Sequence, residues 1–395
     1  WAQSADDMQK SSAAVTYANA QLLLAYQQQD GVAMADLTIC RGWFNQLLGD
    51  VAHARKDYDE GLQRARVAHE PKLEAQALSH RGAMLSFHGA AGQGLVDLTR
   101  AHTIYERLGL ISWSQHVQLE IAAAFRRMGL YTDAFTALAP LRPYFIASSD
   151  RFGMARLSDQ LALIYLRTER YQDALAELEL SSAYYRQIRY RIEHAARQIM
   201  KAEALLGLGN PDEAKSLLDA ASKVLLADVD PVLYGRVELV RAKWQLQAGQ
   251  PEQALQSLER VEPILKAKGY VLFLTTLYAL RAEAQEALHN YPAALAAQRD
   301  NLTQEQLLAQ LLREQSIAWV RGEFELARQE GDNARLRIEQ QLQQQELELV
   351  KERRFWLLVV MVLCGVLALL TMGWLLDRNR RMRRLAFTDE LTGIN

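Results

Sequence analysis

Eight titratable side chains in the middle of the sequence have types and spacing suited to binding a charged ligand. When the chain is read in steps of forty residues, they fall at related positions: His116, Arg126, Arg127, Arg156, Asp159, Arg167, Arg236 and Lys243. Arginine and lysine bind carboxylates and phosphates because their N–H groups donate charge-assisted hydrogen bonds. We therefore expect these residues to line a candidate binding groove for an acidic ligand. A solvated helix face is the alternative interpretation.

Other residue types with catalytic or metal-binding potential lack the spacing that such chemistry needs. The eight histidines form no HExxH pattern, and the two cysteines, Cys40 and Cys364, form no metal-binding or disulfide pattern. The segment GLGNPDEAK (207–215) lacks the Gly-Lys-Ser/Thr end of a phosphate loop, and no predicted strand precedes GAAGQG (89–94). We therefore expect no catalytic site in residues 1–376 and no cofactor or metal in this chain.

The composition predicts an all-α protein. The 395 residues are rich in Ala, Leu, Gln, Glu and Arg, which favour helices, and Val and Ile form no alternating runs. The formal net charge of −2 provides no general positive field for nucleic acid. We therefore expect helices throughout and no nucleic-acid partner.

Small residues recur every forty positions and indicate paired helices that approach closely. One column comprises Ala54, Gly94, Ala134, Ala174, Ala214, Ala254 and Ala294. Twelve residues earlier, a second column comprises Gly42, Gly82, Ala122, Ala162, Ala202, Ala242 and Ala282. Five residues before the first column, glycine predominates, as expected at a helix end with a left-handed residue: Gly49, Gly89, Gly129, Glu169, Gly209, Gly249 and His289. Four residues after the first column leucine predominates, which predicts a buried stripe on the second helix.

The segments LGLGNPDEAKSLLDAA (206–221) and LQAGQPEQALQSL (246–258) carry this pattern most clearly, and they resemble tetratricopeptide repeats. The usual period of about 34 residues is shorter than forty, so each helix is expected to be longer than usual. The resemblance implies a solenoid of about seven repeats over residues 31–300, preceded by a helical cap over residues 1–30. Another α-solenoid, such as a HEAT array, is the alternative. A solenoid offers a concave surface, which implies a peptide, protein or small-molecule ligand or a second copy of the chain.

A single long helix is predicted after the repeats, because no proline follows Pro292. Residues 301–354 contain strong helix formers, and their apolar side chains follow an imperfect heptad: Leu336, Ile338, Leu342, Leu347 and Leu349. This signalling helix is expected to form a coiled coil in a homodimer. A charged, solvated helix against the last repeat is the alternative.

The uncharged run FWLLVVMVLCGVLALLTMGWLL (355–376) predicts a transmembrane helix. Twenty-two residues at a rise of 1.5 Å span roughly 33 Å, enough for a hydrocarbon core of about 30 Å. Trp356 and Trp374 lie near its ends, as membrane-interface residues do. More basic residues follow the run than precede it, which places the C-terminal side in the cytoplasm. The basic residues that follow, expected to contact headgroups from a stalk over residues 377–388, are Arg378, Arg380, Arg381, Arg383 and Arg384.

The final residues, LAFTDELTGIN (385–395), resemble the opening turn of GGDEF domains, the diguanylate cyclases. The residues that match are Asp389, Leu391, Thr392 and Gly393. The resemblance implies that residues 389–395 begin a cytoplasmic domain that makes cyclic di-GMP from two GTP with Mg²⁺ or Mn²⁺. The matched residues belong to a structural turn and not to the metal site.

These features together predict the sensory half of a single-pass protein of the bacterial inner membrane, with the solenoid in the periplasm. A periplasmic ligand is expected to change the arrangement of two protomers, and the long helix to transmit that change. Two alternatives remain open. One is a membrane-anchored tetratricopeptide adaptor, and the other is the input half of a sensor histidine kinase.

Overall fold

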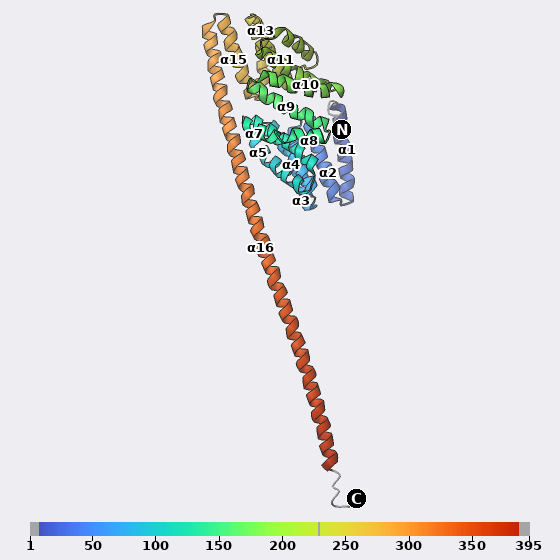
Figure 1. The fold of residues 1–395 in the computed structure, drawn as a ribbon. Helices are drawn as coiled ribbons and strands as arrows, with labels where there is room; N and C mark the ends of the chain where they lie inside the picture. The colour runs from blue at the N-terminus through green and yellow to red at the C-terminus, as the bar shows by residue number, and fades with distance from the viewer. Residues whose placement is uncertain (1–7, 228–229, 387–395) are drawn as a thin grey trace, which may run out of the picture. The chain divides into compact units, whose positions relative to one another are not determined.

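The structure is a computed structural model that describes residues 8–227 and 230–386. Within these residues the regular elements are all helices, and Figure 1 shows α1 to α15 stacked in chain order. The predicted all-α class is confirmed. The helices are α1 (Met8–Gln27), α2 (Gly31–Leu47), α3 (Val51–Val67), α4 (Pro71–Phe87), α5 (Ala91–Arg107), α6 (Ile111–Arg127), α7 (Tyr131–Leu138), α8 (Leu141–Ala147), α9 (Arg151–Arg167), α10 (Tyr171–Gln187), α11 (Arg191–Gly207), α12 (Pro211–Ser222), α13 (Pro231–Gln247), α14 (Pro251–Lys268), α15 (Val271–Ala287) and α16 (Tyr291–Ala386).

The turns between helices repeat every twenty residues. A residue with positive φ ends nearly every helix of the solenoid, where its left-handed backbone satisfies the last carbonyls of that helix. The sequence pattern identified only every second one of these turns, because glycine is scarcer at the others. The residues are Gln29, Gly49, His69, Gly89, Gly109, Gly129, Ser149, Glu169, Arg189, Gly209, Gly249, Gly269 and His289; Val229, at the remaining position, lies outside the described residues.

The two columns of small residues lie between the helices of each pair, as predicted. A Cβ atom built on Gly82 of α4 would lie 2.7 Å from the carbonyl oxygen of Gly94 on α5, so only glycine fits there. The later pairs use alanine, and Ala122, Ala162 and Ala174 are fully buried. The leucine column is buried as well: Leu98, Leu138, Leu178, Leu218 and Leu258. These contacts confirm a repeat of two helices.

In one pair, the second helix departs from the regular pattern. In the third pair the chain forms α7 and α8 with a break between them at Pro140, whose backbone lacks the N–H group that would continue a helix. Phe145 of α8 is fully buried against Gly153 of α9, where a larger residue would collide with its ring. The break therefore bends the chain without opening the core.

The described chain divides into two compact units. The first unit ends at Glu323 and includes the first third of α16. The second unit begins at Phe324 and contains the rest of α16. By length and composition α16 could cross a membrane, because an 18-residue window in it has a mean hydropathy of 2.7 and contains no buried residue.

Candidate functional site

The first helices of successive pairs are linked to one another by side chains on one face. Arg127 Nη1 of α6 donates to Ser86 Oγ of α4 at 2.8 Å, and Arg126 Nε donates to Gln160 Oε1 of α9 at 3.1 Å. The partners are 41 and 34 residues apart, so each bond joins neighbouring repeats. We call this surface the inner face. Its residues are His80, Phe87, Glu120, Arg126, Arg127, Arg156, Gln160, Arg167, Glu203, Arg236 and Lys243.

Two of the predicted arginines on the inner face are neutralised by carboxylates. Arg156 of α9 forms an ion pair with Glu120 of α6, and the side chains keep 27% and 18% of their exposure. Arg236 Nη2 of α13 lies 2.6 Å from Glu203 Oε2 of α11. The nearby arginines hold the pKa of both glutamates below its ordinary value, although burial opposes this. These pairs fasten one repeat to the next.

Asp159 and His116 also have partners within the protein. Asp159 is buried and forms an ion pair with Arg197 of α11, whose guanidinium lies 4.1 Å from the ring centre of Tyr185. His116 Nε2 lies 2.9 Å from Asp150 Oδ2 at the start of α9. Both residues therefore support the packing of α9 rather than facing a ligand.

The remaining predicted cations form no hydrogen bond or ion pair with a carboxylate in the described part of the chain. Carboxylates are nevertheless near them, because Glu120 acts electrostatically on Arg127, and Glu203 is affected by the charges of Arg167 and Lys243. Arg126 donates only to the neutral Gln160, and Arg127 donates to Ser86 and lies 5.5 Å from the ring centre of Phe87. Among the described residues, Arg167 and Lys243 have neither a hydrogen-bond partner nor an ion-pair partner. The inner face therefore carries six cations and two carboxylates, an excess of four positive charges.

The unneutralised charge is concentrated around Arg126. Its pKa is lowered to about 9, first by burial and then by the positive charges of Arg127, Arg236 and Arg167. Arg236 belongs to the sixth helix pair and Arg126 to the third, so the solenoid brings cations from distant repeats together. Such a cluster favours an anion between the guanidinium groups.

Aromatic residues beside this cluster were not identified from the sequence. His80 lies 5.1 Å from the ring of Trp43 and 5.8 Å from the ring of Tyr58, and burial lowers its pKa to about 4. Phe87 is 60% exposed. The repeat register could have identified them, because His80 and Phe87 lie forty residues before Glu120 and Arg127.

The first third of α16 packs against α5 and α6. The backbone N–H of Gly92 donates to Gln315 Oε1 at 3.1 Å, and a side chain at Gly92 would collide with the backbone carbonyl of Gln315. Trp319 meets Phe125 edge-on, with ring centres 5.4 Å apart. The glycines of GAAGQG therefore serve helix packing: Gly92 admits α16 and Gly94 admits α4.

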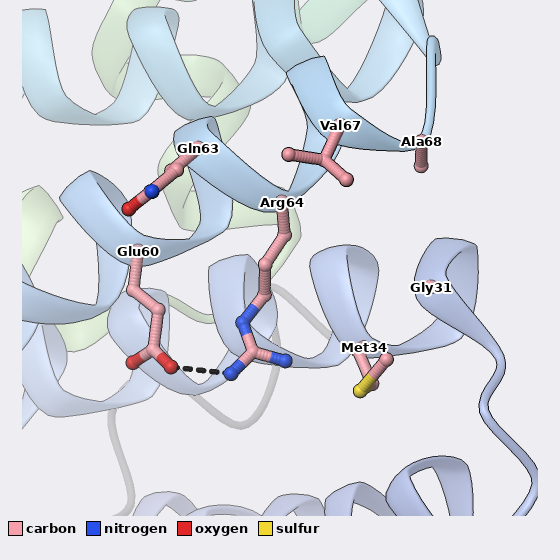
Figure 2. A pocket seen from close by; sticks show the side chains of 7 residues that line it. All are labelled: Gly31, Met34, Glu60, Gln63, Arg64, Val67 and Ala68. Carbon is pink, nitrogen blue, oxygen red and sulfur yellow. Dashed lines mark hydrogen bonds and ion pairs between the residues drawn. The ribbon is translucent and has the colours of Figure 1, made fainter.

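A separate cavity of about 480 Å³ lies between α2 and α3 (Figure 2). Arg64 and Glu60, four residues apart on α3, form an ion pair at 2.5 Å along one wall of it, so their charges cancel. This cavity therefore lacks the unneutralised charge of the inner face. Its lining residues are Gly31, Met34, Glu60, Gln63, Arg64, Val67 and Ala68.

The predicted membrane-interface residues lie on the second unit. Trp356 and Trp374 are 63% and 60% exposed. The guanidinium of Arg378 lies 5.4 Å from the ring centre of Trp374, and Arg381 Nη2 lies 2.8 Å from Asp377 Oδ2. Arg380 and Arg383 are exposed on the same helix, whereas the side chain of Arg384 is outside the described residues. The turn residues Asp389, Leu391, Thr392 and Gly393 also lie outside them.

No cluster of three or more His, Cys, Asp or Glu side chains suited to a metal occurs among residues 8–227 and 230–386. No protein-family model matches the sequence. No curated protein matches it either.

Solved structures do resemble the chain. A Rap protein complexed with competence and sporulation factor is 15% identical and has a TM-score of 0.59, with 73% of this chain and 80% of that chain covered. The apo form of the quorum sensor NprR from B. thuringiensis is 14% identical, with a TM-score of 0.51 and coverages of 75% and 82%. A tetratricopeptide repeat protein from Parabacteroides merdae is 15% identical, with a TM-score of 0.43 and coverages of 71% and 98%. At such identities a likeness concerns the fold alone, and the fold of this chain is a tetratricopeptide-like α-solenoid followed by a long helix.

Proposed function

We propose that this chain is the sensory and membrane-crossing part of a bacterial diguanylate cyclase. The solenoid binds a ligand in the periplasm, and α16 transmits the binding across the inner membrane to a cytoplasmic GGDEF domain. The observation that carries this proposal is at the end of α6. Phe125 packs against Trp319 of α16, and the next two residues, Arg126 and Arg127, belong to the inner face. A ligand that moves the end of α6 therefore acts directly on the packing of α16.

The membrane segment is supported by the run 355–376, which contains no charged residue. Tryptophans near both ends suit the two interfaces, and the excess of arginine after the run supports a cytoplasmic C-terminal side. The solenoid is then extracytoplasmic. Its single half-buried thiol, Cys40, is compatible with an oxidising compartment.

The output is proposed from the resemblance of residues 389–394 to a GGDEF opening turn. That domain would bind GTP with Mg²⁺ or Mn²⁺ and would join two GTP molecules when two copies face each other. The role of the present chain is to control how often those copies meet. A coupling free energy of about 1–3 kcal/mol between ligand binding and this arrangement changes output by roughly fivefold to 150-fold.

A homodimer is proposed through the second unit. Exposed apolar side chains there are spaced by 14, 4 and 7 residues, which suits heptad positions of a coiled coil. They are Phe324, Ile338, Leu342 and Leu349, with exposures of 68%, 58%, 56% and 65%. Pairing two copies would bury this surface and place the two membrane helices together.

The ligand is proposed to be a peptide or protein. The two neighbours with the higher TM-scores are a Rap protein bound to competence and sporulation factor and a quorum sensor. Both share the solenoid fold with this chain, and this likeness supports a concave surface that is large enough for a peptide or protein. The inner face supplies the charged groups that would bind this ligand.

Insertion of one, two, three or four residues after Arg383 in the full-length protein tests the proposal. Helical transmission predicts that cyclic di-GMP production varies with the helical phase of the insertion, because each residue rotates the output domain by about 100°. A seven-residue insertion, close to two full turns, is the matched control and restores most of the activity. A response that does not depend on insertion length contradicts transmission through the helix.

A further inference from the structure

We infer that the inner face around Arg126 is the binding site for an acidic group of a peptide ligand, with Phe87 receiving an apolar side chain next to that group. This inference deepens the proposed function by naming the ligand class of the same site. It concerns binding by the solenoid, so it can be tested independently of the output domain.

The half-buried arginines of the inner face differ in their partners. Arg156 and Arg236 each face a carboxylate of the neighbouring repeat. Arg126 is equally enclosed between first helices, but its partner is the neutral amide of Gln160. A half-buried guanidinium bonded only to an amide retains donors for a carboxylate, and two further arginines stand nearby.

Arg126 and Arg127 do not behave as cations of a simple solvated surface. Cations that only improve solubility point away from one another into water, where salt screens them. Arg126 and Arg127 instead are half-buried and lie on adjacent positions at the end of α6, and the exposed Arg167 lies at the same place one repeat later. The protein holds these like charges together, at a cost in free energy that an anionic ligand would remove.

Phe87 adjoins the cluster and offers an exposed apolar surface. The guanidinium of Arg127 lies over the ring of Phe87 at 5.5 Å, and Phe87 is 60% exposed. An apolar side chain placed on that ring would lie beside the anion bound by Arg127. The site therefore favours a peptide in which Asp, Glu or a terminal carboxylate adjoins a Leu, Ile or Phe.

A random heptapeptide mixture, incubated with the detergent-solubilised full-length protein and recovered for mass spectrometry, tests this inference. We expect the bound fraction to be enriched in acidic residues next to large apolar residues. The double variant Arg126→Gln/Arg167→Gln should lower the affinity for the recovered peptides at least tenfold, and Phe87→Ala should remove the apolar preference. The matched control is Arg55→Gln/Arg107→Gln, which removes two exposed charges from other helices and should leave affinity unchanged.

Three results would overturn the inference. Recovered peptides without acidic enrichment would contradict the site, as would equal affinity of the Arg126→Gln/Arg167→Gln variant and the wild type. Inorganic phosphate that displaces the peptides at micromolar concentration would assign the cluster to a free anion instead. Thermal unfolding of each variant is measured in parallel, since removing repelling charges should not lower the unfolding temperature. If peptides bind as expected while the insertions after Arg383 have no effect, the binding site stands and the proposed output fails.

Discussion

Two groups of arginines on the same solenoid show how one residue type serves two purposes. Arg156, Arg197 and Arg236 each pair with a carboxylate one repeat away and fasten first helices together. Arg126 and Arg127 of α6 and Arg167 of α9 form no hydrogen bond or ion pair with a carboxylate in the described chain. The two groups differ in whether a carboxylate pairs with the guanidinium. Paired arginines are expected to contribute stability, and unpaired ones to contribute binding.

Removing a paired arginine should have the largest effect. Arg197→Ala leaves Asp159 buried without its counterion, and breaking such a buried pair costs about 3–5 kcal/mol of unfolding free energy. Chemical denaturation followed by circular dichroism measures it. Arg170→Ala is the control, because its pair with Asp173 is exposed and worth about 0–1 kcal/mol. Equal losses for the two variants would contradict the distinction.

The half-buried histidine beside the cluster, His80, should make stability depend on pH. The folded-state pKa of His80 is about 4, below its ordinary 6.5, so protonation favours the unfolded chain. Its contribution is therefore present above pH 6.5 and is lost as the pH falls from 6.5 to 4. The loss is at most about 3 kcal/mol, and Glu120 nearby reduces it. In His80→Gln the same pH change should cost measurably less; an identical pH profile would refute this.

Blocking the contact between α5 and α16 should have an intermediate effect. Gly92→Leu places a side chain against the backbone of Gln315 and should destabilise the packed helix by about 1–3 kcal/mol. We expect faster proteolysis of residues 291–323, which measures how far this part of α16 separates from the solenoid. Gly331→Leu is the control, because nothing lies near that position and the helix should become slightly more stable. Unchanged proteolysis in Gly92→Leu would show that the contact does not hold α16.

Removing an unpaired arginine should have the smallest effect on stability. Arg126→Gln loses one hydrogen bond to Gln160 but relieves repulsion from Arg127, Arg167 and Arg236. We expect the free energy of unfolding to stay within about 1 kcal/mol of the wild type or to rise. Differential scanning calorimetry of both proteins measures it. A loss comparable to that of Arg197→Ala would mean that Arg126 is structural.

The fold could be predicted from the sequence because each repeat carries its own local signals. Glycine at Gly89 and Gly129 marks helix ends, and small residues such as Ala122 mark close contacts between paired helices. The second set of turns escaped prediction because Ser149 and Arg189 adopt the same left-handed backbone without glycine. Local composition cannot reveal such positions, since neighbouring helices impose the geometry.

The site could be predicted only in part, for a related reason. The register of the repeats predicted that Arg126 and Arg127 lie on the groove-facing side of first helices. In the structure both donate hydrogen bonds to neighbouring first helices. The same register could not reveal that Asp159 is taken by Arg197, because that pairing depends on how one repeat stacks on the next. The contact of Trp319 with Phe125 joins residues almost two hundred positions apart, and no local pattern encodes it.

The central claim is that the inner face and α16 are coupled through the end of α6. Hydrogen exchange of residues 308–323, measured in the full-length protein with and without a saturating acidic peptide from the heptapeptide selection, tests it most directly. The account predicts that the peptide changes exchange in this segment in the wild type and not in Arg126→Gln/Arg167→Gln. Exchange in residues 308–323 that is unaffected by a peptide bound to the wild type would contradict it.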